Sequence, residues 1–214
     1  MPANASTDWT CYSVAGHSCE LFTPPTILEP GRILLYLHDL QERSPKDFPA
    51  LYKALESTGL PVLAPRIGRT WCLQQQLNRF DNTMSAEYCI LRPILDECHR
   101  ITGATSGGVG LLGCEMGGQA ALRLAYRHPD KFPIAAAIAP AIDFHLGMRH
   151  GHDWADGELF DTLWEIFDEP EQARQETAIL HVHPLTWPRH QWLVSSSNDA
   201  RWHDGAVRLS SKLN

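Results

Sequence analysis

The sequence of 214 residues lacks any hydrophobic run long enough to cross a membrane, and it has no surplus of positive charge. Its 18 lysines and arginines face 25 aspartates and glutamates, which gives a formal net charge of −7. Such an acidic chain offers no general attraction to nucleic acid or to anionic lipid. Residues 1–8 contain no basic patch followed by an apolar core, so no export signal is expected. These absences predict a cytoplasmic protein with neither a nucleic-acid nor a membrane partner.

Cysteine pairs at the spacing of a metal site or a disulfide framework are also missing. The six cysteines are scattered among apolar segments, at positions 11, 19, 72, 89, 98 and 114. Isolated thiols in apolar surroundings indicate reduced side chains, most of them buried.

Short apolar runs separated by glycine and proline fill the rest of the chain, with no internal repeat and no low-complexity segment. Residues 1–214 are therefore expected to form a single domain. Strand patterns alternate with helix patterns, which predicts an α/β fold with a mostly parallel sheet and helices on both faces. The expected strands are residues 33–38, 60–65, 109–113, 134–139 and 191–195, and the expected helices are 47–57, 83–101, 116–127 and 204–213.

The stretch of residues 146–188 interrupts this alternation. It carries two amphipathic helical segments, 159–167 and 171–179, and reads as a helical insertion. In parallel sheets the functional residues gather at the carboxyl ends of the strands. We expect the insertion to lie over that rim.

A glycine-rich turn follows the expected strand 109–113. The hexapeptide Gly113-Cys114-Glu115-Met116-Gly117-Gly118 has the spacing of the G-x-S-x-G turn that carries a catalytic serine between a strand and a helix. Glu115 stands where the serine would be. Gly113 and Gly117 occupy the two positions that must be small, because the strand and the helix approach closely there. A generic glycine-rich turn is the alternative interpretation.

The sequence downstream of this turn carries a family resemblance. Residues 117–125, His128-Pro129-Asp130-Lys131-Phe132 and residues 137–143 resemble the putative esterases of the esterase D group, which includes S-formylglutathione hydrolases and bacterial carboxylesterases. The resemblance runs from about residue 33 to the last residue and is most specific over 113–143. It implies an α/β-hydrolase fold and the hydrolysis of a carboxylic ester or thioester without a cofactor.

The resemblance also implies roles for individual positions. Glu115 is at the nucleophile position and Asp199, after the strand 191–195, is at the position of the catalytic acid. The segment His38, Asp39 and Leu40 corresponds to one half of the oxyanion hole, with Asp39 where glycine is usual, and the N–H of Met116 to the other half. The family's histidine would follow one further helix and strand, so the fold is expected to lack the last strand and helix.

The carboxylate of Glu115 is expected to fill the oxyanion hole itself, against the N–H groups of Met116 and Leu40. The N-terminal dipole of the following helix favours an anion there by about 0.3–1 kcal/mol, so we expect the side chain to stay ionised. His38 and His203 are the two histidines that could act as a replacement base, but a structural role is the stronger interpretation for both. A metal site built from these histidines with Asp39, Glu115 and Asp199 is conceivable, yet no metal is predicted.

Three functions remain open at this point. The leading one is an esterase-family homologue that is impaired as a serine hydrolase, with a small ester or thioester as its ligand. The first alternative is a non-catalytic module for ligand binding or protein interaction on the same fold. The second is a weak hydrolase that uses Glu115 as a carboxylate nucleophile or as a base. An unprotected sheet edge at residues 191–195 would also allow two copies of the chain to form a homodimer.

Overall fold

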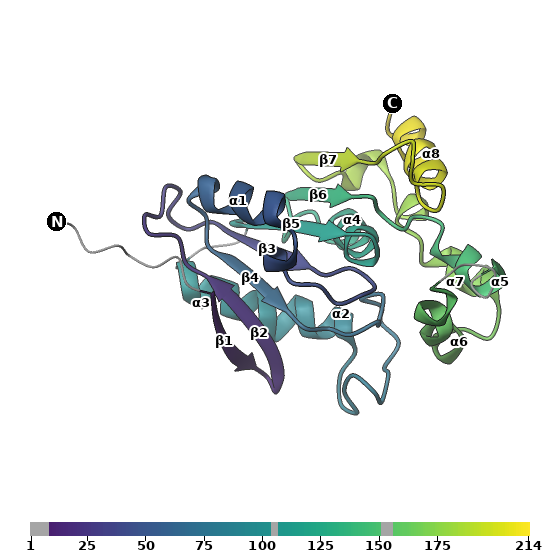
Figure 1. Ribbon diagram of the computed structural model, residues 1–214, viewed down its shortest axis with the longest axis horizontal. Helices are drawn as coiled ribbons and strands as arrows, with labels where there is room; N and C mark the ends of the chain where they lie inside the picture. The colour runs from purple at the N-terminus through teal and green to yellow at the C-terminus, as the bar shows by residue number, and fades with distance from the viewer. Residues whose placement is uncertain (1–8, 104–106, 151–155) are drawn as a thin grey trace.

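A seven-stranded sheet forms the centre of the protein, as the computed structural model shows for residues 9–103, 107–150 and 156–214 (Figure 1). The remaining residues lie outside the described structure, including residues 1–8 and part of the insertion. The strand order is β1-β2-β4-β3-β5-β6-β7. The strands are β1 Trp9–Val14, β2 His17–Phe22, β3 Ile33–Leu37, β4 Val62–Pro65, β5 Val109–Cys114, β6 Ile134–Ile138 and β7 His190–Val194.

The five strands from β4 to β7 in this order are parallel, and their carboxyl ends form one rim. Leu37 pairs with Gly113, and Gly113 pairs with Ala137. Ile138 pairs with Val194 on the last strand. The residues that follow these strand ends, Glu115 among them, therefore meet at the same edge of the sheet.

Helices cover both faces of the sheet (Figure 1). Helix α1, Pro49–Thr58, packs its Leu55 on one face. The other face buries the main apolar core against four helical segments, which are α2 Ala86–Cys89, α3 Leu95–Thr102, α4 Met116–Arg127 and α8 His203–Leu213. The predicted α/β architecture, with a mostly parallel sheet and helices on both faces, is confirmed.

Short helices make up the insertion between β6 and β7. They are Phe144–Leu146, α5 Gly147–His150, Gly157–Phe160, α6 Asp161–Ile166, α7 Pro170–Gln175, Ala178–Leu180 and Pro184–Thr186. Of these, α5, α6 and α7 lie beyond the strand ends in Figure 1. Phe144 stacks on the buried Trp71 with ring centroids 4.6 Å apart, and Phe160 lies 5.9 Å from Trp202. A second apolar core thus joins the insertion to the rim.

Two local features differ from the sequence-based expectation. The expected helix 83–101 is broken by a π-helical segment, Ile90–Ile94, because Pro93 lacks an N–H and cannot continue a regular α-helix. The hairpin of β1 and β2 was not predicted. Its turn places Ala15 at φ 50° and Gly16 at φ 89°, the left-handed conformations that two-residue hairpin turns require.

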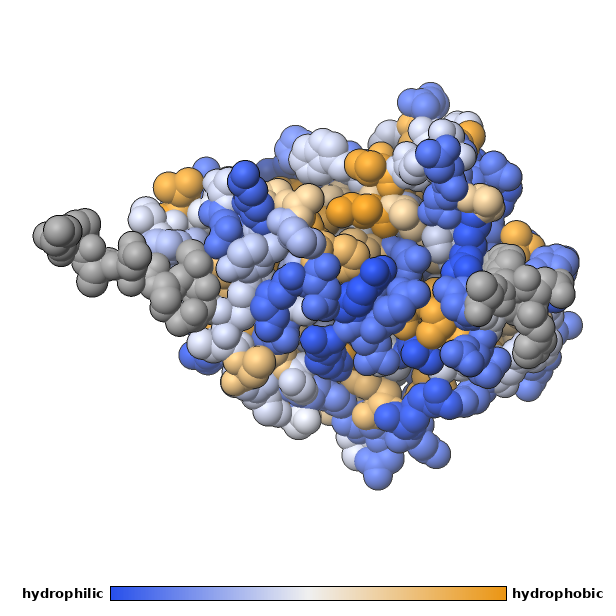
Figure 2. Space-filling model, in the orientation of Figure 1, coloured by the Kyte–Doolittle hydropathy of each residue, from blue (hydrophilic) through white to orange (hydrophobic). Residues whose placement is uncertain are grey.

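Strand β7 lies at the edge of the sheet and, within the described residues, pairs with β6 alone. Ile138, Trp192 and Val194 are 36%, 56% and 59% exposed on these two strands. Figure 2 shows hydrophobic atoms gathered over this part of the sheet. A homodimer through this edge stays a prediction.

The six cysteines are free, and all but Cys11 are buried. No helix in the described part of the chain is long and apolar enough to cross a membrane.

A buried ionic network ties α4 to its neighbours. The Arg123 guanidinium contacts Glu87 of α2 at 2.5 Å and also pairs with Glu176, which follows α7. Arg127 adds a second cation 3.0 Å from Glu87. Burial alone would raise the pKa of the Glu87 carboxyl, but His128 and these two guanidinium groups outweigh it and lower the pKa to about 2. Arg123 therefore holds both the helical layer and the insertion in place.

Replacing Arg123 by leucine should lower the free energy of unfolding by about 3–5 kcal/mol, because the buried Glu87 loses its compensating charge. Urea unfolding of the two proteins measures the difference. Arg92→Leu, at an exposed position of the neighbouring helical segment, is the matched control and should change stability little. A loss at Arg123 no larger than at Arg92 would contradict this role for the network.

Candidate functional site

The turn between β5 and α4 holds the backbone of Glu115 in a conformation that residues other than glycine rarely adopt. Its backbone angles are φ 45° and ψ −109°. Such a conformation costs about 1–3 kcal/mol and persists only where the surroundings enforce it. The Glu115 N–H donates to the Ile138 carbonyl at 3.0 Å, and its own carbonyl accepts from the N–H groups of Gln119 and Ala141 at 3.0 Å.

Close backbone packing around the turn explains its two glycines. A Cβ atom on Gly113 would lie 2.1 Å from the Gly117 carbonyl oxygen. A Cβ atom on Gly117 would lie 2.0 Å from the carbonyl oxygen of Leu37, at the end of β3. Any side chain at either position would collide with backbone, so β3, β5 and α4 approach as closely as they do only because both residues are glycine.

The carboxyl group of Glu115 is mostly removed from water. Burial raises its pKa, and the nearby charge of Asp39 raises it further. The N–H of Leu40 and the cations Arg43 and Arg201 act in the opposite direction. Oε2 is buried, and within the described residues it accepts no hydrogen bond. The helix dipole was expected to keep this carboxyl ionised, but burial shifts its pKa the other way.

The segment His38-Asp39-Leu40 lies beside Glu115, and Asp39 and Glu115 line the same cavity. Leu40 is fully buried, and its N–H lowers the pKa of the Glu115 carboxyl. Within the described residues, no hydrogen bond joins the N–H of Met116 to that carboxylate. Asp39 is fully buried and accepts from the backbone N–H of Arg43 at 2.9 Å and from its Nε at 2.5 Å. The segment thus carries an ion pair between a buried carboxylate and a guanidinium group that is 44% exposed. The sequence analysis missed Arg43, because an i, i+4 spacing indicates a contact only within a helix and these residues are not helical.

Both histidines considered as bases are occupied elsewhere. His38 donates from Nδ1 to the Asp39 carbonyl at 2.8 Å, while its Nε2 accepts from the Ile67 N–H at 3.2 Å. Burial lowers its pKa, which suits a neutral imidazole in this place. His203 Nδ1 lies 2.9 Å from the Ser195 hydroxyl. In the described structure no imidazole is hydrogen-bonded to Glu115.

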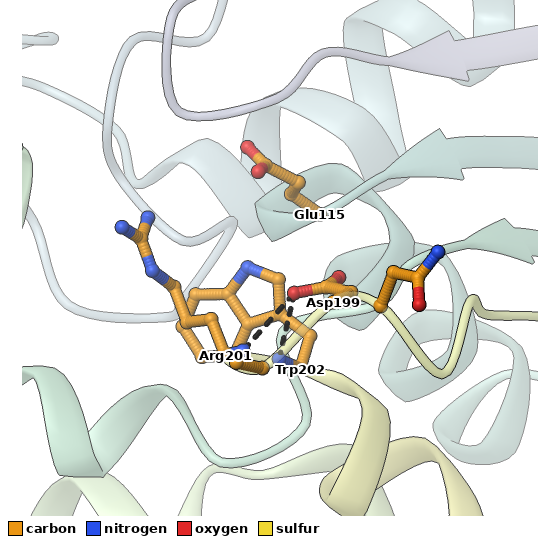
Figure 3. A pocket seen from close by; sticks show the side chains of 6 residues that line it. Glu115, Asp199, Arg201 and Trp202 are labelled. Carbon is orange, nitrogen blue, oxygen red and sulfur yellow. Dashed lines mark hydrogen bonds between the residues drawn. The ribbon is translucent and has the colours of Figure 1, made fainter.

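Asp199 organises the loop between β7 and α8. Its Oδ1 accepts from the backbone N–H groups of Arg201 at 3.1 Å and Trp202 at 3.2 Å (Figure 3). The Glu115 side chain extends away from Asp199 in the same view. Arg201 in turn pairs with Asp156 through both terminal nitrogens. At the position predicted for the catalytic acid, the Asp199 carboxylate therefore accepts hydrogen bonds from backbone N–H groups of its own loop.

Cavities flank Glu115 on both sides. One, of about 430 Å³, is lined by Glu115 together with residues 198–202. The other, of about 540 Å³, is mainly apolar and lies against α1 and the ends of β5 and β6, with Phe48, Leu51 and Ile138 in its wall and Arg43 at its border. Glu115 is common to both, so a ligand that spans them would pass over its carboxyl group.

Metal ligands do not assemble at this rim. Among the residues that the structure describes, no group of three or more His, Cys, Asp or Glu side chains could hold a metal ion. The five residues considered for such a site do not converge, because His38 bonds to Ile67 and His203 to Ser195.

Replacing Glu115 by glutamine should stabilise the protein at neutral pH and have no such effect in acid. A carboxyl whose pKa is raised by folding stabilises the folded state below its ordinary pKa of 4.5, and that contribution is lost as the pH rises through the folded pKa. Urea unfolding over a pH series measures this. Glu158→Gln, at an exposed position, is the control. If the Glu115→Gln variant gained unfolding free energy over the original protein as the pH fell, the raised pKa of Glu115 would be contradicted.

Comparison with known proteins gives a family. A family model described as "Putative esterase" matches residues 75–211. A search of curated proteins finds no match.

Solved structures share the fold. An S-formylglutathione hydrolase from Agrobacterium tumefaciens is 15% identical with a TM-score of 0.66, over 94% of this chain and 80% of that chain. Carboxyl esterase 2 from Tuber melanosporum is 13% identical with a TM-score of 0.66, over 99% of this chain and 74% of that chain. Acylaminoacyl peptidase from Pyrococcus horikoshii is 14% identical with a TM-score of 0.69, over 96% of this chain and 34% of that chain.

The fold of these structures, the glycine-bounded turn at residue 115 and a family match over more than half of the sequence lead to one conclusion: the chain belongs to the putative esterase family and has an α/β-hydrolase fold.

Proposed function

We propose that this protein binds a small ester, thioester or similar acyl compound across the rim at Glu115, and that it is impaired as a serine hydrolase. The observation that carries the proposal is the half-buried carboxyl group of Glu115 in the strained turn, with no imidazole bonded to it among the described residues. Serine hydrolysis needs a nucleophile, a base that takes its proton and an oxyanion site. In this chain a carboxyl group stands in place of the serine nucleophile. It lies beside the segment of Leu40, which the family resemblance assigns to the oxyanion site.

The cavities support ligand binding at this position. The apolar cavity of about 540 Å³ falls in the size range of small-molecule sites, and an acyl chain or an aryl ring would gain by leaving water there. The neighbouring cavity of about 430 Å³ is bordered by the exposed Asn198, whose side-chain amide offers hydrogen bonds to a polar end. An ester or thioester, apolar at one end and polar at its centre, matches this division.

A weak hydrolase is the second candidate, because a carboxyl with a raised pKa is suited to proton transfer nearer neutral pH than an ordinary glutamate. As a base, Glu115 would take a proton from a water molecule that attacks the ester carbonyl. As a nucleophile, its oxygen would bond to the acyl carbon while the alcohol leaves. The mixed anhydride formed in the nucleophile route is then hydrolysed by water. Attack of ¹⁸O-labelled water at the Glu115 carbonyl carbon places label in the peptide that contains Glu115, which the base route does not do.

Hydrolysis of p-nitrophenyl acetate should have a kcat about 10⁴-fold or more below that of an esterase with a complete triad. Glu115→Ser should restore little of it, because the described residues bring no imidazole to position 115. Neither protein should react with a fluorophosphonate probe, as judged by intact mass. Stoichiometric labelling of the Glu115→Ser variant, or sustained turnover by either protein at the rate of a complete triad, would contradict the proposed impairment.

Ligand binding can be tested without any reaction. Butyrophenone, an unreactive ketone with the shape of an aryl ester, should bind saturably and change the tryptophan fluorescence. Ala50→Trp, at the wall of the apolar cavity, should weaken binding by about 10-fold or more, which corresponds to about 1.4 kcal/mol. Ala54→Trp, exposed on the same helix outside the cavity, is the control. Equal affinities for the two variants would show that the ligand does not enter this cavity.

A further inference from the structure

A third cavity, which shares no lining residue with the two cavities that Glu115 borders, is lined by cations. It has a volume of about 410 Å³ and lies where the start of β2 meets the chain that follows β4. Arg66, Arg69 and Arg79 line it, together with His17, and Glu42 is its one acidic lining residue. The chain as a whole has a formal net charge of −7, whereas the lining of this cavity has more basic than acidic residues.

The charge of Arg69 is not neutralised by a carboxylate. Its Nε donates to the Leu40 carbonyl at 2.9 Å, and among the described residues it forms no ion pair. A guanidinium group has five N–H donors in a planar fork that matches the oxygens of a phosphate or carboxylate. Since one donor is used on Leu40, the terminal nitrogens of Arg69 stay available for an anion.

The two other arginines are held in place by partial pairing. Arg66 donates to the Glu42 carbonyl and lies 3.5 Å from Glu20, but Glu20 already pairs with Lys46 at 3.0 Å. Arg79 pairs with Glu165 on the insertion, and both side chains are about half exposed. Exposed pairs of this kind contribute little free energy, so an anion in the cavity can compete for the Arg79 guanidinium.

One wall of the cavity is aromatic. His17 stacks on Phe80 with ring centroids 4.2 Å apart and an interplanar angle of 10°, and its Nε2 lies 3.0 Å from Asp81. Both rings belong to the lining. A cavity of this volume holds more than a bare oxyanion, and the aromatic wall offers a flat apolar surface to the remainder of a small organic molecule.

We propose that this cavity binds a phosphate group, either as free phosphate or as the monoester of a small organic molecule. A phosphate carries a charge of about −1.5 to −2 at neutral pH, which suits several guanidinium groups better than a single carboxylate does. The site is joined to the rim at Glu115, because Arg69 holds the carbonyl of Leu40, the residue after Asp39, and Asp39 and Glu115 line the same apolar cavity. In the bound state, the Arg69 guanidinium group would donate to the phosphate and to the Leu40 carbonyl at the same time.

The test is a titration of the intact chain with inorganic phosphate and with phenyl phosphate at constant ionic strength, followed by isothermal calorimetry and by amide NMR. Saturable binding with a Kd below about 1 mM, with shifts at the amides of Arg69 and Leu40, is the expected result. Tighter binding of phenyl phosphate would identify an organic monoester as the ligand, and equal affinity would identify free phosphate.

Variants separate this site from general charge. Arg69→Gln and Arg79→Gln should each weaken phosphate binding by about 10-fold or more, whereas Arg92→Gln, at an exposed position outside the lining of the cavity, should leave it unchanged. The amide shifts of the unmodified protein provide an independent answer if a variant fails to fold. Absence of saturable binding, shifts confined to other parts of the chain, or equal losses in all three variants would each overturn the proposal.

Discussion

The absence of side chains at Gly113 and Gly117 allows β3, β5 and α4 to meet with their backbones in contact. This contact sets the conformation of Glu115, because the chain must turn from strand to helix within one residue. The carbonyl and N–H of that residue are then fixed by β6, by Ala141 and by the first turn of α4. The cavities on either side of the rim, and the direction in which the residue 115 side chain extends, follow from this one close approach.

A rigid turn of this kind places whatever side chain it carries in a defined electrostatic environment. For a hydroxyl group the same place would supply amides to a developing negative charge. A carboxyl group there loses contact with water and lies near the charge of the buried Asp39, and both effects raise its pKa, burial more than Asp39. The geometry of a hydrolase and the chemistry of a binding site can thus coexist on one backbone, since the backbone constrains position and the side chain determines reactivity.

Sequence reasoning gave the architecture well, because parallel strands buried on both faces are continuous apolar runs and the helices between them show a clear period. It also identified Gly113 and Gly117, whose requirement is local. The hairpin at Trp9–Phe22 was missed because its strands are only partly buried and its turn, Ala15-Gly16, is a weak signal. The ion pair of Arg201 joins it to Asp156, far away in the sequence, and Asp39 and Arg43 lie outside any helix, where an i, i+4 spacing does not indicate a contact. The roles assigned to Asp199 and the oxyanion segment stay predictions.

Helix α4 joins two parts of the molecule that are distant in sequence. Its first residue follows the turn at Glu115, and its Gln119 and Arg123 side chains grip the segment that includes Glu176 and Ala178. The backbone turn that positions the Glu115 side chain and the contacts that anchor residues 176–178 therefore belong to one continuous helical element. Any change that shifts α4 alters both places at once.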